Sequence, residues 1–342
     1  MGAPTGGGKT RLVAACADVP RCGQRVSERV QSCSEWHGDG TDGEGEAGSE
    51  ATSLCELSSW RQDDHIAVAA TVGVILMAEP ERWQVSTDAA EVYESCFVPA
   101  IFGAWAGPVA DAAGISRGDK VLDVGCGTGV LAREALRRAG PEGQVVGLDL
   151  NEGMLAVAAR AEPNVEWRRG DAASLPFEDA SFDVVVSQFA LMYIPDRMAS
   201  LREMWRTLAP GGRLAVASWA PIDHARGYQI LVDVAGRQCG REAADVLAAP
   251  FVLGDQAELA NLYAGSGISG ARVTLHEGSI RFPSVKEFIR IEVKGSPLAD
   301  MLSDDAMQAL AAESENALVE FVVPSGEIVM PMDAHIVTAS NG

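Results

Sequence analysis

The sequence VLDVGCGTG at positions 121–129 decides the fold of this chain. Three of its first four residues are apolar, which is typical of a short strand buried in a parallel sheet, and three glycines follow in alternation. The next residues, VLAREALRRAG at 130–140, carry apolar side chains at helical spacing until Gly140 and Pro141 end the pattern. The stretch therefore predicts a strand, a glycine turn and a helix.

A second strand is predicted at Gln144–Leu150, and it places Asp149 twenty residues after Gly129. Glycines let the backbone approach a ligand closely, and a carboxylate at this place accepts hydrogen bonds from ribose hydroxyls, so the unit favours a nucleoside ligand. A dinucleotide fingerprint needs a third Gly or Ala where this chain has Val130, and no Tyr-x-x-x-Lys pair lies near a strand end. Both departures count against an NAD(P)-dependent oxidoreductase, which remains the alternative enzyme class.

Four motifs in order resemble those of class I S-adenosylmethionine-dependent methyltransferases. They are VLDVGCGTG at 121–129, VVGLDLNEGML at 145–155, GDAASLPFEDASFDVVVSQFAL at 170–191 and LREMWRTLAPGGRLAVASW at 201–219. The chain is most similar to the small-molecule branch around the ubiquinone/menaquinone-biosynthesis enzymes. The resemblance implies an α/β fold with a Rossmann-like sheet of seven strands, mostly parallel with the last strand antiparallel, and helices on both faces. It also implies S-adenosylmethionine as cofactor and a small-molecule methyl acceptor.

The resemblance assigns the methionine end of the cofactor to the first motif. Gly125, Gly127 and Gly129 would lie under the methionine part, and Asp123 would orient the cofactor's amino end or the loop itself. Gln188, at the end of the fourth strand, would border the methyl donor. Taken singly, the glycines could be plain turn residues and Gln188 a surface amide; their order in the chain favours the cofactor.

The ribose and adenine are assigned to the second and third motifs by the same resemblance. Asp149 would hold the ribose hydroxyls, with Leu150 and Met154 against the adenine. Asp171 would accept from the exocyclic amine of adenine, with the Ala172 backbone beside it. The alternative for each aspartate is a structural one, in which Asp149 caps the helix that follows it and Asp171 caps a short turn.

The remaining strands are predicted by the continuing alternation of helix and strand patterns. A third strand precedes the GDA turn at 170–172, and the later ones are predicted at Phe182–Ser187, Arg213–Trp219, Ala271–His276 and Glu327–Thr338. In the resembled family the last strand is antiparallel and lies beside the sixth. Pro331 predicts a bulge, an edge or an interruption within that strand, because proline cannot donate to a sheet.

Methyl transfer is an in-line displacement on an already activated donor, so alignment and exclusion of water are the main tasks of the enzyme. No metal and no covalent nucleophile are needed. A general base is required if the acceptor is a hydroxyl or an acidic carbon. Tyr193 and His224 are weak candidates, because they follow the fourth and fifth strands at the ligand end of such sheets. The alternative is a half-buried tyrosine and a surface histidine.

Two aromatic or amphipathic segments are predicted to cover the acceptor. One is Val92–Trp105, which contains Phe97 and Trp105 and precedes the first strand. The other is 280–323, predicted as a helical insertion near the substrate cleft. The alternative for both is ordinary core packing, since aromatic residues at helical spacing usually belong to a core.

The first 76 residues differ from the rest and are predicted to be a poorly ordered leader, with the methyltransferase domain at 77–342. The acidic, glycine-rich run at 37–50 cannot bury enough apolar surface to fold, and the apolar run at 66–78 is too short to span a membrane. APTGGGKT at 3–10 resembles a phosphate-binding loop but lacks the preceding strand that such a loop needs. A mis-assigned start or a fusion remnant is the expected origin of this region.

Composition excludes several classes of function. With 48 Asp and Glu against 27 Lys and Arg, the formal charge of −21 counts against binding nucleic acid or an anionic membrane. Seven cysteines without a C-x-x-C pair, and five histidines, indicate neither a disulfide framework nor a zinc site, so a reducing cytoplasm is the expected location. A non-catalytic S-adenosylmethionine-binding protein stays open as an alternative. The identity of the acceptor, the atom methylated and the oligomeric state are not encoded in any motif.

Overall fold

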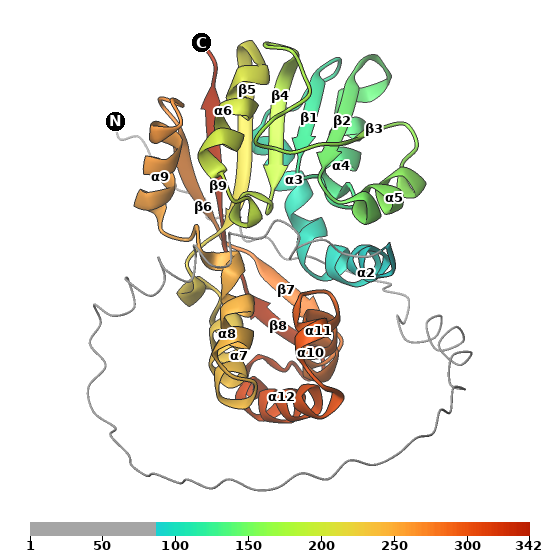
Figure 1. Ribbon diagram of the computed structural model, residues 1–342, viewed down its shortest axis with the longest axis vertical. Coiled ribbons are helices and arrows are strands. Elements are labelled where there is room, and N and C mark those ends of the chain that lie inside the picture. The colour runs from blue at the N-terminus through green and yellow to red at the C-terminus, as the bar shows by residue number, and fades with distance from the viewer. Residues whose placement is uncertain (1–86) are drawn as a thin grey trace, which may run out of the picture.

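A computed structural model describes residues 87–342, and a seven-stranded sheet forms its upper half (Figure 1). The strand order is β3-β2-β1-β4-β5-β9-β6. The strands are β1 Lys120–Val124, β2 Gln144–Asp149, β3 Glu166–Arg169, β4 Phe182–Gln188, β5 Leu208–Trp219, β6 Arg272–His276 and β9 Ala334–Ser340. All pairings are parallel except those of β9, which runs antiparallel to both β5 and β6. The predicted fold class is therefore confirmed.

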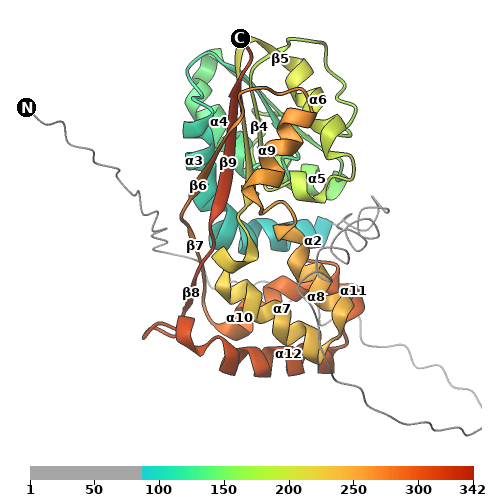
Figure 2. The same ribbon diagram turned by 90° about the vertical axis from the view of Figure 1, so that its left-hand side faces the viewer.

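Helices cover both faces of this sheet. Two of them, α3 and α4, lie on one face, while α6 and α9 lie on the other (Figure 2). The bounds are α3 Gly103–Ala112, α4 Val130–Ala139, α5 Glu152–Ala161, α6 Arg197–Thr207 and α9 Gln256–Gly265. The central strands are apolar on both faces for this reason, with Val121, Leu122 and Val184 fully buried.

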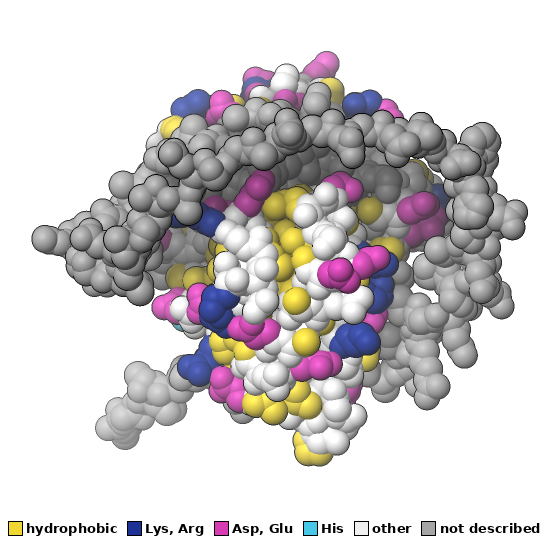
Figure 3. All heavy atoms as spheres, turned by 60° about the horizontal axis from the view of Figure 1, so that its bottom comes forward, with side chains coloured by type: hydrophobic (Ala, Val, Ile, Leu, Met, Phe, Trp, Pro, Cys, Tyr) yellow, Lys and Arg dark blue, Asp and Glu magenta, His cyan; other side chains and the backbone are white. Residues whose placement is uncertain are grey.

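A second group of elements, which we call the lower lobe, lies beyond the carboxyl ends of the parallel strands (Figure 1). Its strands β7 and β8 form an antiparallel pair. The lobe consists of β7 Ser279–Phe282, β8 Ile328–Pro331, α7 Arg226–Gln238, α8 Arg241–Ala248, α10 Val285–Lys294, α11 Leu298–Met301 and α12 Asp304–Ala317. Figure 3 shows its outer face, where hydrophobic side chains are interrupted by both acidic and basic ones. None of the helices within 87–342 is both long and apolar enough to cross a membrane.

The interruption that Pro331 predicts within Glu327–Thr338 is confirmed, although the two parts do not belong to one sheet. The segment forms two strands in different sheets, β8 in the lower lobe and β9 in the main sheet. The chain leaves the first pairing after Pro331, whose ring nitrogen cannot donate, and the Met332 N–H donates to the Gly278 carbonyl (3.0 Å). Asp333 Oδ1 then accepts from the Gly278 N–H (3.0 Å), so the side chain fixes the crossing between the lobes.

The predicted start of the fifth strand at Arg213 also differs from the structure. β5 begins at Leu208, because Leu208 pairs with Phe182 before a bulge shifts the register to Val184 and Arg213. The segment 280–323 likewise opens on strand β7 before the chain becomes helical in α10, α11 and α12. The phosphate-loop motif at 3–10, the runs at 37–50 and 66–78, and the boundary at Met77 lie outside the described residues.

The segment that precedes the first strand includes a π-helix, which is wider than an α-helix. α2 Thr87–Val92 continues into the π-helix η3 Tyr93–Phe102, which contains Pro99 and ends with the Gly103 N–H bonded to the Val98 carbonyl. Positions nine residues apart would lie on opposite sides of an α-helix with 3.6 residues per turn. The wider turn of η3 instead brings Phe102 beside Tyr93, with ring centroids 5.0 Å apart.

Candidate functional site

The glycine turn after β1 uses its three glycines for different reasons. Gly125, Gly127 and Gly129 all have positive φ, at 68°, 54° and 85°. A Cβ at Gly125 would lie 2.4 Å from the Ala190 Cβ, and one at Gly129 would lie 2.2 Å from the Trp167 ring. A Cβ at Gly127 would meet nothing within 4 Å. Packing therefore demands the outer two glycines, while the middle one leaves open space above the turn.

Asp149 ties this turn to the end of β2. Its Oδ2 accepts from the Gly127 N–H and its Oδ1 from the Asn151 N–H, each at 2.8 Å. Burial raises the pKa of its carboxyl, and these backbone hydrogen bonds oppose the shift. The structure also excludes the capping alternative, because Asn151 caps α5 by accepting from the Met154 N–H. Each oxygen of Asp149 retains capacity to accept a further hydrogen bond, as ribose hydroxyls require.

Asp123 is a buried carboxyl without a matched donor. Its side chain is 1 % exposed, and neither oxygen has a hydrogen-bond partner among residues 87–342. Burial raises its pKa to about 8 and the nearby Asp149 charge adds to the shift, while the Ala132 N–H, which is near but makes no well-formed hydrogen bond, opposes it. An orphaned buried carboxyl beside a second one is a site for a cation, which fits the ammonium group of the expected cofactor.

The residues assigned to adenine follow the ends of β2 and β3. Leu150 is 40 % exposed and Met154 is half-buried on α5, so both leave apolar surface uncovered. Asp171 is exposed and its Oδ1 accepts from the Ala173 N–H (2.8 Å), while Ala172 is buried. The other oxygen of Asp171 has no hydrogen bond from residues 87–342, which leaves it available to an amine.

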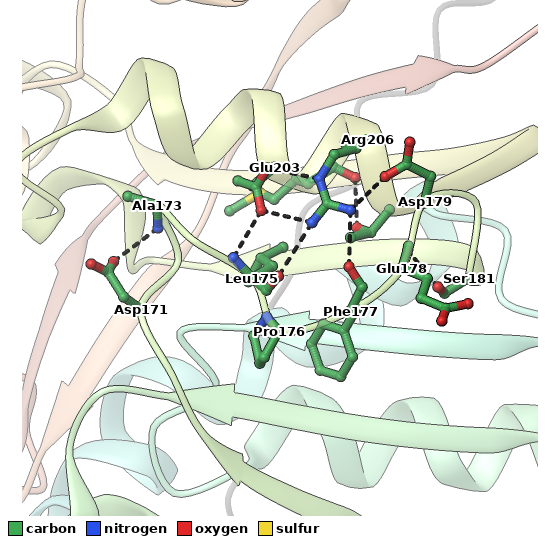
Figure 4. Close-up of polar contacts among 12 residues, drawn as sticks. Asp171, Ala173, Leu175, Pro176, Phe177, Glu178, Asp179, Ser181, Glu203 and Arg206 are labelled. Carbon is green, nitrogen blue, oxygen red and sulfur yellow. Dashed lines mark hydrogen bonds and ion pairs between the residues drawn. The ribbon is translucent and has the colours of Figure 1, made fainter.

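Arg206 of α6 holds the loop that carries Asp171 (Figure 4). Its guanidinium donates to the carbonyls of Leu175 (3.2 Å) and Phe177 (2.9 Å). It also pairs with Glu203 and Asp179, each at 2.7 Å, and Glu203 in turn accepts from the Leu175 N–H (2.9 Å). Three of these hydrogen bonds reach backbone atoms of an irregular loop and hold the segment that follows Asp171 against α6.

The end of β4 is strained and polar. Gln188 Nε2 donates to the Phe102 carbonyl (3.1 Å), and Oε1 is buried without a partner among the described residues. The next residue, Phe189, has a φ of 54°, a backbone conformation that costs free energy for any residue other than glycine. Its ring stacks on that of Trp219 at 3.6 Å, which holds the turn in this conformation. Gln188 therefore stands at the carboxyl edge with a free acceptor.

Aromatic rings from three parts of the chain meet at this edge, and we call them the junction cluster. The ring of Phe102 on η3 lies 5.9 Å from that of Phe189 and 6.3 Å from that of Trp219, and it is tilted against both. The cluster consists of Tyr93, Phe97, Phe102, Trp105, Phe189 and Trp219. Phe97 and Trp105 are buried inside it, whereas Tyr93 and Phe102 are partly exposed. The cluster can receive a flat apolar ligand.

The two weak candidates for a base lie in different surroundings. Tyr193 ends the 3₁₀ turn η5 Leu191–Tyr193, and burial with the nearby Glu292 charge raises its pKa, so its hydroxyl stays protonated at neutral pH. His224 ends η6 Ile222–His224, is 39 % exposed, and contacts Asp333 Oδ2 at 3.0 Å through Nδ1. That contact joins His224 to the crossing between the lobes rather than to the glycine turn.

One buried polar pair in the lower lobe is not among the residues predicted from the sequence. Tyr228 of α7 donates to Glu292 Oε1 of α10 (2.5 Å), and both side chains are buried. The signal was present, because Glu292 follows Phe288 by four residues and shares its buried helix face. Within 87–342, no group of three or more His, Cys, Asp and Glu side chains is arranged to hold a metal ion.

Comparisons with known proteins point to one class of enzyme. The family described as "Methyltransferase domain" matches residues 121–212. Demethylmenaquinone methyltransferase of Listeria monocytogenes serotype 4a (strain HCC23) is 34 % identical over 180 residues, which are 48 % of this chain and 76 % of the relative. The chloroplastic 2-phytyl-1,4-beta-naphthoquinone methyltransferase of Arabidopsis thaliana is 38 % identical over 120 residues, 33 % of this chain and 46 % of the relative.

A solved structure shows the same fold. It is that of phosphoethanolamine N-methyltransferase 2 of Haemonchus contortus in complex with S-adenosyl-L-methionine. The match has a TM-score of 0.50 at 20 % identity and covers 76 % of this chain and 58 % of that one.

Proposed function

Since this chain belongs to the class I S-adenosylmethionine-dependent methyltransferases of the quinone-biosynthesis type, we propose that its acceptor is a hydroxylated aromatic ring of the quinol type. The chain is an enzyme that transfers a methyl group from S-adenosylmethionine to a small molecule. The observation that carries the proposed acceptor class is the junction cluster, which lies beside Gln188 at the carboxyl end of β4, where Gln188 Nε2 donates to the Phe102 carbonyl. The names of the Listeria and Arabidopsis relatives support the same class.

The proposed cofactor residues divide the ligand between three loops. Asp149 binds the ribose hydroxyls, Asp123 binds the ammonium group, and the open space at Gly127 admits the methionine chain. Leu150, Met154 and the loop of Asp171 and Ala172 enclose the adenine, while Gly125 and Gly129 shape the turn. When bound, S-adenosylmethionine supplies a methyl group on a positively charged sulfur, and the two buried aspartates favour that charge.

The acceptor is proposed to lie flat against the junction cluster. Phe102 and Tyr93 are the partly exposed members, so their rings are available for stacking. The free Gln188 Oε1 accepts a hydrogen bond from a ring hydroxyl and thereby sets which carbon faces the methyl donor. The formal charge of −21 favours such a neutral acceptor over a nucleic acid. The cytoplasmic location and the domain boundary at Met77 remain predictions from the sequence.

Two measurements test this function. Calorimetric titration with S-adenosylhomocysteine and with NADH separates the methyltransferase from the oxidoreductase; binding of NADH alone would contradict the cofactor assignment. Transfer of labelled methyl groups to a reduced 2-prenyl-1,4-naphthoquinone then separates an enzyme from a cofactor-binding protein. Phe102→Leu should raise the KM for the quinol, because it removes a stacking ring. The matched control is Phe177→Leu, whose ring packs on Phe182 outside the junction cluster and whose loss should leave that KM unchanged.

A further inference from the structure

The most unusual polar group outside the cofactor site is Glu292, on the buried face of α10. Its neighbours on that face are Val285, Phe288 and Ile289, and its own side chain is 8 % exposed. A carboxyl in such surroundings costs several kcal/mol when charged unless donors surround it. A residue that served packing alone would be apolar here, so the carboxyl requires a reason.

One hydrogen-bond donor reaches the carboxyl of Glu292, and its second oxygen is open. Tyr228 donates to Oε1 at 2.5 Å, and the Tyr228 ring is fixed between Phe251 (5.5 Å) and Phe288 (5.4 Å). Among residues 87–342, no donor reaches Oε2. Burial raises the pKa of Glu292 to about 7, and the Tyr228 hydrogen bond opposes the shift. Such a carboxyl can both take up and release a proton near neutral pH.

Glu292 lies next to the junction cluster. Gly295, one turn further along α10, is so close to Phe97 that a Cβ there would lie 2.1 Å from Cε2 of the ring. Tyr193 is near enough for the Glu292 charge to raise its pKa, and η5 packs against η7 Ala249–Phe251. The charges of Tyr193 and Asp149 likewise raise the pKa of Tyr93 in the junction cluster. Electrostatic interactions therefore link Asp149, Tyr93, Tyr193 and Glu292 across the junction between the main sheet and the lower lobe.

The other charged groups around α10 lie outside the buried core. Burial and the Tyr228 hydrogen bond are the two influences on the pKa of Glu292. The facing titratable groups are Tyr228 of α7 and Tyr193 of η5. Three elements pack against α10, namely β7, α11 and α12. The charged residues of these four elements other than Glu292 are half-buried or exposed: Lys286, Glu287, Arg290, Lys294, Arg281, Asp300, Asp304, Asp305, Glu313 and Glu315.

We propose that Glu292 is the general base of the methyl transfer, with Oε2 taking the hydroxyl proton of the aromatic acceptor and Tyr228 positioning the carboxylate. This assignment rests on the proposed quinol acceptor. As the hydroxyl proton moves to Glu292, electron density passes into the ring, and a ring carbon forms the new bond to the methyl carbon. The bond between the methyl carbon and the sulfur breaks, and its electron pair stays on the sulfur. The methylated ring carbon then loses its hydrogen as a proton to water, and Glu292 returns its proton to the ring oxygen. One proton is released overall.

The test compares Glu292→Gln, Tyr228→Phe and the wild-type chain with S-adenosylmethionine and a reduced 2-prenyl-1,4-naphthoquinone. For the wild type, kcat should rise tenfold per pH unit up to a pKa near 7, because the ionised carboxylate is the base. Glu292→Gln should lower kcat about 10²-fold or more and remove that dependence, with the Kd for S-adenosylhomocysteine unchanged. Tyr228→Phe should shift the rise to higher pH, because it removes the hydrogen bond that favours the ionised form. A merely structural role would not move the pH profile.

Glu287→Gln, on the same helix but paired with Arg290 at the surface, is the matched control and should keep the wild-type profile. A Glu292→Gln variant that retains the rate and the pH dependence overturns the proposal. If the wild type does not methylate the naphthoquinol, the proposed acceptor is wrong, and infrared difference spectra of the S-adenosylhomocysteine complex decide on Glu292. A carboxyl band that titrates near pH 7 and is absent from Glu292→Gln supports the base. A Glu292 that is fully ionised below pH 5 overturns it.

Discussion

Replacing Asp123 with asparagine should stabilise the ligand-free protein at neutral pH and weaken its affinity for S-adenosylhomocysteine. The side chain is 1 % exposed and its carboxyl has a pKa of about 8 in the folded chain, against an ordinary value of 3.8. Between these two values the unfolded chain has released the proton that the folded chain keeps. The folded chain therefore binds more protons, and its free energy of unfolding falls as the pH rises from about 4 to about 8.

The magnitude follows from that interval. At pH 7 the aspartate is ionised in the unfolded chain and mostly protonated in the folded chain. This pH lies about 3 units above 3.8, the ordinary pKa of the aspartate. At about 1.4 kcal/mol per pH unit, the cost of Asp123 is about 4 kcal/mol of unfolding free energy. Asparagine has nearly the same shape and no charge to bury, so Asp123→Asn should recover most of that amount. Loss of the carboxylate opposite the ammonium group should cost about 1.5–3 kcal/mol of binding, a roughly ten- to hundredfold weaker Kd.

Urea unfolding followed by tryptophan fluorescence at pH 5, 7 and 8.5 measures the first effect, and calorimetry with S-adenosylhomocysteine measures the second. The gain of Asp123→Asn over the wild type should grow with pH. The control is Asp183→Asn, which weakens a carboxylate that accepts from the Lys120 N–H (2.8 Å) and should destabilise the chain at each pH. A variant that is less stable than the wild type at pH 7, or a gain that does not depend on pH, would refute the assignment of Asp123 as a strained cation site.

Three further predictions concern the turn, the junction cluster and the domain boundary. Gly129→Ala should unfold more readily than Gly127→Ala in a urea titration, because its Cβ meets the Trp167 ring at a φ of 85°, while Gly127→Ala should mainly weaken S-adenosylhomocysteine binding in calorimetry. Trp105→Ala should lower the free energy of unfolding by about 3–5 kcal/mol, since the ring is buried against Phe189 and Trp219; unchanged stability with impaired acceptor binding would show a pocket role instead. A chain that starts at Met77 should be soluble and bind S-adenosylhomocysteine as the full chain does, and an insoluble product would contradict the proposed boundary.

Local patterns were sufficient to predict the unit that contains the glycine turn and Asp149. Strand, glycine turn, helix and Asp149 follow one another within thirty residues, and each is decided by apolar spacing or by glycine chemistry. The same patterns could not separate a ribose ligand from a helix cap at Asp149, because both need an acid at the end of β2. Only the hydrogen bond from the Met154 N–H to Asn151 shows which residue caps α5.

Features that depend on contacts between distant residues could not be predicted from the sequence. The hydrogen bond between Tyr228 and Glu292 joins residues 64 positions apart, so the spacing of Glu292 after Phe288 indicates a buried helix face but does not identify the partner on α7. The π-helix η3 depends on i→i+5 bonding that no apolar period revealed, yet it decides that Phe102 faces Tyr93. The split of Glu327–Thr338 was foreshadowed by Pro331, but its cause is the contact of Asp333 with Gly278.

We propose that the enzyme methylates a carbon of a hydroxylated aromatic ring that lies against the junction cluster. Mass spectrometry and proton NMR of the product from S-adenosylmethionine and a reduced 2-prenyl-1,4-naphthoquinone test it most directly. The product should carry one added methyl group on the free ring carbon, formed together with one S-adenosylhomocysteine. A methyl group on a ring oxygen, or no transfer by a chain that binds S-adenosylhomocysteine, would contradict it.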